Sequence, residues 1–318
     1  MTRLASATIA LAAVLAVGAG SGPAHAQTAR TWVSGTGDDA QQCTRTLPCK
    51  TFAGALSKTN AGGEINCLDP GGYGQVTITK SITIDCRDTF ASVQAPSGNG
   101  ITINLDGQNN MIVRLRNISI NGLLTAAIGI SITGTTSTAA NNAVSIEDCV
   151  IDGFLTTGIY DSLSVTGSVS ARLLVKNTII RNGPGTGLSI AGVNGGASQV
   201  KAILDNVSAF DWNQGFAAGN GAQVLIKNSI SASNVSAGIV ADPGAFVAIT
   251  SSTILTNGTG IVAGSGGTIR IGNTDIAFNT TGLSGTVQTF VDNRITNNGA
   301  GGTLSPVSGS VTNPQGWQ

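Results

Sequence analysis

The chain has 318 residues, with 16 basic and 16 acidic side chains, 44 glycines and only 4% aromatic residues. A neutral, charge-poor chain argues against nucleic acid and anionic membranes as partners. Its one histidine, His25, lies in a segment that we expect to be removed. The mature protein would then have neither a Ser-His-Asp triad nor a histidine-bound metal.

Residues 1–26 are typical of a secretory signal peptide. Arg3 supplies the positive start, an apolar run follows, and Ala24 to Ala26 form a small-x-small cleavage site before Gln27. The alternative is an N-terminal membrane anchor, but the run is short and interrupted by glycine. We expect a mature protein that is secreted or periplasmic and does not insert into a membrane.

Export gives the five cysteines an oxidising compartment in which disulfides persist. We predict the pairs Cys43–Cys49, across a short loop, and Cys67–Cys86, across neighbouring strands, with Cys149 left over. The alternative is that some of them are buried small residues. The chain has no CxxC motif, so no metal site is predicted.

Residues 27–62 are predicted to cap the fold, with a short helix in TFAGALSKT at 51–59. From residue 63 to 298 the sequence repeats itself every 20–31 residues. Two independent markers keep the same spacing. The first is Asn117, Asp148, Asn177, Asn206, Asn228, Ser251, Asn273 and Asn293, and the second is Gly129, Gly158, Gly187, Gly215, Gly238, Gly260 and Gly282.

Apolar residues alternate before each aligned Asn, for example Val113 and Leu115, or Val224 and Ile226. Alternation indicates strands with one buried face. Short strands at this spacing, with no helices between them, favour a coil in which each strand lies parallel to its copy in the next turn. We expect the aligned Asn residues to form a buried column whose amides bond to one another.

The repeats and the segment TWVSGTG…GGYG at 31–74 resemble right-handed parallel β-helix proteins of the pectin-lyase-like superfamily. The resemblance covers most of residues 31–298. It implies an all-β right-handed parallel β-helix, a solenoid of about nine or ten turns, with a short N-terminal capping helix. It does not fix an activity, because the superfamily includes lyases, hydrolases, esterases, epimerases and adhesins.

The residue before each aligned Asn changes sign from turn to turn, which predicts an ion ladder on the outside of the coil. Its members are Arg116, Glu147, Lys176, Asp205 and Lys227. Stacked strands lie about 4.8 Å apart, so opposite charges on adjacent turns attract. We interpret this ladder as structural and not catalytic.

Two places are candidates for a binding site. The three longer turns place loops at 133–142, 164–171 and 191–199 on one side of the coil, where they would form a ledge of small polar residues. The second candidate gathers carboxylates, a guanidinium and rings on successive turns, with Asp152, Arg181 and Asp211 as catalytic groups and Phe210, Trp212 and Tyr160 as substrate contacts. A surface salt bridge with an aromatic cover is the alternative interpretation of this cluster.

The superfamily's enzyme motifs are mostly missing from this chain. Polygalacturonase-like hydrolases carry Asn-Thr-Asp, Asp-Asp and Gly-His-Gly motifs, of which only Asn273–Asp275 matches here. The resemblance implies no cofactor, except calcium if the protein is a lyase. We therefore predict an exported, non-catalytic surface or matrix protein that binds a polysaccharide or another cell-envelope component. The alternative is a polysaccharide lyase or hydrolase acting on an acidic polysaccharide. Residues 299–318 are expected to be a Gly/Ser-rich tail.

Overall fold

A computed structural model describes residues 28–136, 141–165, 170–191 and 199–307. The predicted signal peptide, the greater part of the predicted ledge and the end of the tail, including Trp317, lie outside these residues. Within the described part of the chain, no helix is long and apolar enough to cross a membrane.

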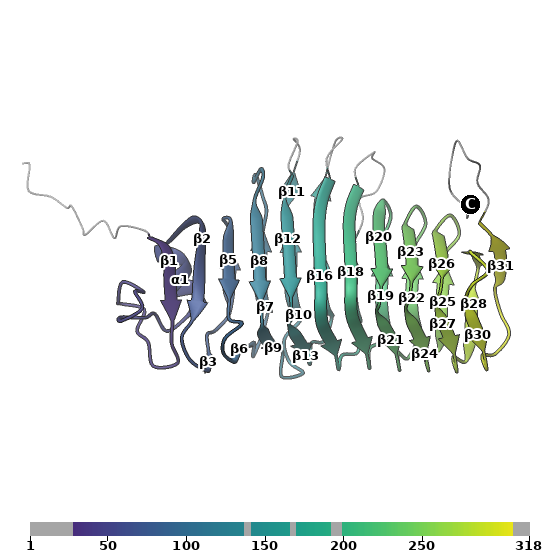
Figure 1. The fold of residues 1–318 in the computed structure, drawn as a ribbon, viewed down its shortest axis with the longest axis horizontal. Helices are drawn as coiled ribbons and strands as arrows, with labels where there is room; N and C mark the ends of the chain where they lie inside the picture. The colour runs from purple at the N-terminus through teal and green to yellow at the C-terminus, as the bar shows by residue number, and fades with distance from the viewer. Residues whose placement is uncertain (1–27, 137–140, 166–169, 192–198, 308–318) are drawn as a thin grey trace, which may run out of the picture.

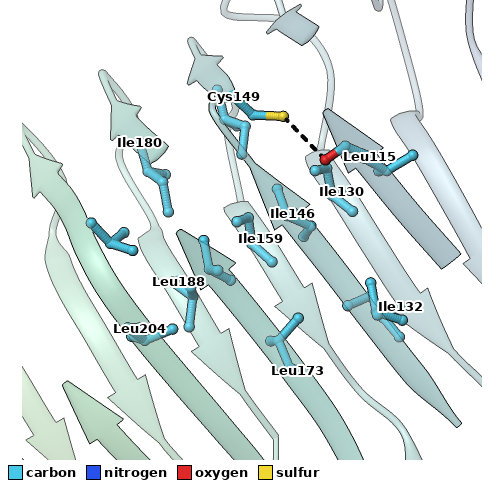
Figure 2. Packing of buried hydrophobic residues seen from close by; sticks show 14 of the residues in the cluster. Leu115, Ile130, Ile132, Ile146, Cys149, Ile159, Leu173, Ile180, Leu188 and Leu204 are labelled. Carbon is cyan, nitrogen blue, oxygen red and sulfur yellow. Dashed lines mark hydrogen bonds between the residues drawn. The ribbon is translucent and has the colours of Figure 1, made fainter. Parts of the chain in front are cut away.

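The alternating apolar residues point inward, as predicted. Val113, Leu115, Val224 and Ile226 are each at most 5% exposed. Figure 2 shows such side chains from successive turns lying over one another in the interior. Because every turn buries the same positions, each strand pairs in parallel with its copy in the next turn, and the chain winds into one elongated coil (Figure 1).

The coil has three faces. The first face consists of β1 (Thr28–Val33), β2 (Thr59–Cys67), β5 (Ile82–Asp85), β8 (Ile112–Arg116), β12 (Ala143–Glu147), the start of β16 (Ser170–Arg181) and of β18 (Gln199–Phe210), β20 (Ala222–Lys227), β23 (Phe246–Thr250), β26 (Thr268–Gly272), β29 (Thr286–Thr289) and β31 (Thr303–Pro306). The second face consists of β3 (Gly71–Gly72), β6 (Ala91–Gln94), β9 (Ile118–Asn121), β13 (Val150–Asp152), the ends of β16 and β18, β21 (Ile230–Ala232), β24 (Thr253–Leu255), β27 (Asp275–Ala277) and β30 (Arg294–Thr296).

The third face is a separate sheet that closes the coil. Its strands are β4 (Val76–Ile78), β7 (Asn99–Asn104), β10 (Ile128–Thr133), β14 (Thr157–Asp161), β17 (Thr186–Ile190), β19 (Gln214–Ala218), β22 (Ala237–Ala241), β25 (Thr259–Ala263) and β28 (Thr281–Ser284). Two short strands, β11 (Thr135–Thr136) and β15 (Ser164–Val165), pair at the base of the predicted ledge. Nine strands in the third face, among the described residues, agree with the predicted nine or ten turns.

The repeated glycines have a steric cause on the third face. A Cβ atom on Gly158 would lie 2.5 Å from the carbonyl oxygen of Gly187, and one on Gly238 would lie 2.6 Å from that of Gly260. Contacts this short do not occur between real Cβ atoms and backbone oxygens. The glycine column therefore lets successive turns approach closely enough to pair.

The aligned Asn column forms the corner between the first and second faces. Its residues from Asn117 to Asn273 have φ between 46° and 58°, a left-handed conformation that Asn tolerates. The amide ladder exists in part, since the Nδ2 of Asn177 donates to Asp148 and that of Asn206 donates to Asn177, both at 2.9 Å. The expectation of burial is wrong, however: Asn117 is half-buried and the other corner residues are exposed.

The last residue aligned by sequence, Asn293, is one position out of register. Arg294 pairs with Asp275, so Asn293 lies opposite Thr274 and not opposite Asn273. Its Oδ1 accepts a hydrogen bond from the backbone N–H of Thr274 at 2.9 Å. Asn293 is therefore not a corner residue.

A second Asn ladder, which the alignment missed, lies inside the coil six residues after the corner. Asn234, Asn257 and Asn279 are 1–3% exposed. Asn257 donates from Nδ2 to the Oδ1 of Asn279 at 3.0 Å and accepts at its own Oδ1 from the Nδ2 of Asn234 at 2.8 Å. The same Oδ1 also accepts from the backbone N–H of Asn234 at 3.0 Å. Each side-chain oxygen thus accepts hydrogen bonds from the Asn of the preceding turn, so these buried polar groups have the partners that burial requires.

The short N-terminal helix and both disulfides are confirmed. Helix α1 (Phe52–Lys58) begins at Thr51, whose side chain accepts a hydrogen bond from the N–H of Gly54. The pairs Cys43–Cys49 and Cys67–Cys86 have Cα atoms 4.6 and 4.9 Å apart. Cys149 is free and buried, with its Sγ near the carbonyl oxygens of Glu147 and Leu115 (Figure 2). Burial raises the pKa of this thiol to about 12, so it stays protonated and unreactive.

At the C-terminal end, strand pairing continues past residue 298, where the coil was expected to end. Strand β31 pairs in parallel with β29 through Thr303 to Pro306. The first part of the predicted tail is therefore one more strand of the first face.

The buried ladder gives a first prediction. Asn257→Ala removes two hydrogen bonds between side-chain amides and leaves the backbone N–H of Asn234 without its acceptor. Losing such buried partners costs about 1–3 kcal/mol per unsatisfied group, so the free energy of unfolding should fall by at least about 2 kcal/mol in urea titrations.

The control for this prediction is Asn206→Gly. It keeps the left-handed backbone of the corner and removes only an exposed hydrogen bond to Asn177. Its effect should stay below about 1 kcal/mol. Equal losses in the two variants would contradict the structural role assigned to the inner ladder.

Candidate functional site

Part of the predicted acid–guanidinium cluster assembles on the second face. Asp152, Arg181 and Phe210 occupy matching positions on β13, β16 and β18. The Nε of Arg181 lies 2.8 Å from Asp152 Oδ2, and the Nδ2 of Asn182 donates to Asp152 Oδ1 at 2.9 Å. Asp152 therefore already has two partners, and the guanidinium of Arg181 is 41% exposed.

The other predicted members of this cluster lie elsewhere. Asp211 is an exposed corner residue with φ of 61°, just after Phe210. Tyr160 is on β14 in the third face, where it pairs with Ser131 and Ser189. Trp212, predicted to contact substrate, is instead in the core at 1% exposure.

The burial of Trp212 has a structural reason. Its backbone N–H donates to the Oδ1 of Asn234, so it occupies the position at which the next turn begins the inner Asn ladder. Its ring fills the space left by glycines in the two turns before it, because a Cβ on Gly183 or Gly158 would meet the ring at 2.1 and 3.3 Å. Trp212 is buried because its position in the turn points inward, although the polar residues beside it in the sequence suggested a surface position.

The predicted ion ladder runs along the first face and begins one turn earlier than expected. Arg116 lies between Asp85 at 3.4 Å and Glu147 at 3.6 Å, and Lys227 lies 3.1 Å from Asp205. Burial alone would raise the pKa of Asp85, but hydrogen bonds and charge from Arg87, together with Arg116, lower it overall. The Lys227–Asp205 pair, whose side chains are 37% and 21% exposed, contributes little stability and mainly favours one register.

Sequence reasoning missed a polar hollow at the N-terminal end of the first face, called here the N-terminal hollow. Its volume is about 640 Å3. Trp32 and Arg30 on β1 point into it, because they alternate with the buried Thr31 and Val33. The lining residues are Arg30, Trp32, Arg45, Glu64, Asn66, Cys67, Leu68, Asp85, Arg87 and Asp88.

Both disulfides hold the walls of this hollow. The Cys43–Cys49 bond closes the short loop that carries Arg45, and the backbone of Trp32 bonds to Cys43 O and Cys49 N at 2.8 and 3.0 Å. The Cys67–Cys86 bond joins the ends of β2 and β5 beside the lining residues. The ring and its polar neighbours are therefore fixed before any ligand arrives, which lowers the entropy cost of binding.

The charges in the hollow are only partly paired. Arg30 lies 3.3 Å from Glu64, and Arg87 lies 2.7 Å from Asp85. Arg45 is exposed and forms no ion pair within 4 Å among the residues that the structure describes. A guanidinium in this state can bind a carboxylate or sulfate through two parallel hydrogen bonds.

No group of three or more His, Cys, Asp or Glu side chains in the described residues lies close enough to hold a metal ion. Two carboxylates of the hollow face arginines, Glu64 facing Arg30 and Asp85 facing Arg87, and Asp152 faces Arg181. What the hollow offers chemically is an aromatic ring, an amide and cations, a set suited to binding.

The fold is a right-handed parallel β-helix, as predicted, and it matches solved β-helix structures. No protein-family model matches the sequence, and no curated protein does. Among solved structures, tailspike protein 2 of Escherichia coli O157:H7 bacteriophage CAB120 matches with TM-score 0.55 and 13% identity over 80% of this chain and 40% of the tailspike.

Two enzymes match over more of their own length. A GH136 lacto-N-biosidase from Eubacterium ramulus has TM-score 0.53 and 10% identity, over 87% of this chain and 68% of the enzyme. Pectate lyase Pel9A has TM-score 0.48 and 14% identity, over 92% of this chain and 79% of the lyase. At such identities the similarity establishes the fold alone.

One buried carboxylate, Asp161 on β14, makes the fold sensitive to pH. It pairs with Ile132 and Ile190, both inward-facing, and is 3% exposed. The backbone N–H of Leu163 donates to it at 3.1 Å. Burial raises its pKa from 3.8 to about 6, since the ion is poorly solvated there.

A carboxyl group whose pKa is raised in the folded protein destabilises the fold at pH values where it is ionised, and not at pH values where it is protonated. Above about pH 6 the folded protein holds a buried ion, and below pH 3.8 both states are neutral. Asp161→Asn should therefore be more stable than the wild type at pH 7.5, by on the order of 3 kcal/mol or less. The difference should shrink between pH 6 and 4 in denaturant titrations. The exposed Asp242→Asn is the control, and an Asp161→Asn effect that is the same at all pH values would contradict this account.

Proposed function

We propose that this protein is an exported, non-catalytic surface or matrix protein that binds a glycan in the N-terminal hollow. The observation that carries the proposal is the partly exposed ring of Trp32, held by two disulfides among arginines, an amide and carboxylates. A sugar ring packs its apolar face on an aromatic side chain while its hydroxyls bond to neighbouring polar groups.

The charge of Arg45 favours a glycan that carries carboxylates. Arg30 and Arg87 each face an acidic side chain, whereas Arg45 has no ion-pair partner among the described residues. A uronate residue seated against Trp32 would bring its carboxylate toward this guanidinium. The matched β-helix proteins include a phage tailspike and a lacto-N-biosidase, so the fold itself is compatible with glycan ligands.

The absence of obvious catalytic groups supports binding over catalysis. Residues 27–318 contain no histidine. On the third face, the row Thr102, Tyr160, Ser189, Ala217 and Val240 carries no charged side chain in those positions. Two disulfides and a chain of zero net charge suit a protein that works outside the cell.

The test is binding to a panel of neutral and acidic polysaccharides, including polygalacturonate and alginate. We expect Trp32→Ala to weaken binding at least tenfold, about 1.4 kcal/mol, and Arg45→Ala to weaken binding of the acidic members only. Arg294→Ala, at the other end of the coil, is the matched control. Unchanged affinity in both hollow variants, with folding verified by circular dichroism, would exclude this site.

A second candidate function is a lyase or hydrolase on an acidic polysaccharide. It is favoured by Asp152, Arg181 and Phe210 lying in one row. In that case Arg181→Ala should abolish turnover of a uronate polymer and leave the fold intact. Assays of the wild type with and without calcium decide the matter, since a protein that cleaves no polysaccharide in the panel is not this enzyme.

A further inference from the structure

The middle of the first face differs from the N-terminal hollow in chemistry. Between β8 and β26, two rows of outward side chains run beside the ion ladder. The inner row is Arg114, Ser145, Leu174, Ile203, Leu225, Ala248 and Arg270, and the outer row is Ile112, Ala143, Arg172, Lys201, Gln223, Phe246 and Thr268. Together they form what we call the first-face groove.

The groove has an apolar floor that faces solvent. Ile112, Ile203 and Phe246 are 40%, 43% and 53% exposed. Two hollows of about 490 and 460 Å3 lie along it, and they share Lys201 and Ile203. The exposed apolar stripe is therefore continuous across several turns, which on a monomer marks an interaction surface.

The charges beside this stripe are unbalanced. Arg172 and Lys201 are direct partners on neighbouring strands, where like charges repel. Their next neighbours in the outer row are Ala143 and Gln223, so no acid separates them. Neither forms an ion pair within 4 Å among the described residues, and the same holds for Arg114.

The contrast with the ion ladder shows that this imbalance is local. A few ångströms away, on the same strands, Glu147 stands next to Arg116 and Asp205 next to Lys227. The chain as a whole has zero net charge. Two exposed cations held side by side repel each other, and an anion bound between them would replace this repulsion with attraction.

The chemistry of the groove selects its occupant. A second copy of this chain would bring cations against cations across a two-fold interface. A polysaccharide would find few hydrogen-bonding groups over Leu174, Ile203 and Leu225. A ligand with an anionic head and an alkyl chain satisfies both parts of the groove at once.

We propose that the first-face groove binds a monoacyl phospholipid with a net anionic head group. Its phosphate lies between Arg172 and Lys201, and its acyl chain covers Leu174, Ile203 and Leu225 toward Phe246. Arginine and lysine both bind phosphate oxygens well, and each methylene removed from water adds to the affinity. This site is separate from the N-terminal hollow and does not depend on the proposed glycan function.

The experiment is calorimetric titration of the whole protein with lysophosphatidate below its micelle concentration. The comparison ligands are inorganic phosphate, which lacks the chain, and lysophosphatidylcholine, whose head group has no net charge. Lysophosphatidate should bind at least tenfold more tightly than either. Equal binding of inorganic phosphate, or equal binding of lysophosphatidylcholine, would overturn the proposal.

Variants locate the site. The pair Arg172→Ala and Lys201→Ala should weaken lysophosphatidate binding at least tenfold, and so should Ile203→Thr with Leu225→Thr. Arg294→Ala on the second face should not change it. Retained binding in both groove variants, competition by polygalacturonate, or binding only to phosphatidylglycerol vesicles would each exclude this site. Denaturant titration checks folding, and the conservative Arg172→Lys variant should keep most of the affinity.

Discussion

The in-register stacking of the turns is the constraint on which the rest of the structure depends. Each residue has the equivalent residue of the next turn as its neighbour, at a strand spacing of about 4.8 Å. A requirement in one turn therefore recurs in the next. The third-face glycines show this most directly, because a side chain on Gly158 would strike the carbonyl of Gly187, and so on along the coil.

Because of this stacking, the sign of a charged residue decides whether it attracts or repels the residue at the same position in the next turn. In the ion ladder, alternating signs make the contacts between turns attractive, which favours one strand register and requires no further function. Arg172 and Lys201 break that rule on the same strands. An interior column tolerates even less mismatch: Asp161 stands among isoleucines, and burial raises its pKa to about 6. Positions that depart from a regular column are thus the ones that the repeat itself does not explain, and they are where a function is best sought.

Much of the fold could be predicted from the sequence because alternation and spacing are local signals. The strands and the ion ladder follow from them, whereas both disulfides were predicted from the cysteine positions in an exported chain and helix α1 from the pattern of residues 51–59. Burial of the corner Asn residues could not be judged, because left-handed backbone is needed there whether the side chain points in or out. The true inner ladder at Asn234, Asn257 and Asn279 was hidden by the more frequent corner Asn. Trp212 was misplaced because its acidic neighbour is a corner residue, and the N-terminal hollow depends on β1, which precedes the first repeat.

The pairing of β31 with β29 bears on how long such a coil can be. The inner Asn ladder presents the same donors and acceptors at Asn234, Asn257, Asn279 and Asn298, so along these turns it does not specify a final turn. Termination has to come from the ends. Pro306 lies in β31 and has no N–H group, so this edge offers a neighbouring strand one donor fewer. A proline in the last described strand of the first face therefore disfavours pairing of a further strand at that position, while α1 lies at the N-terminal end of the described coil.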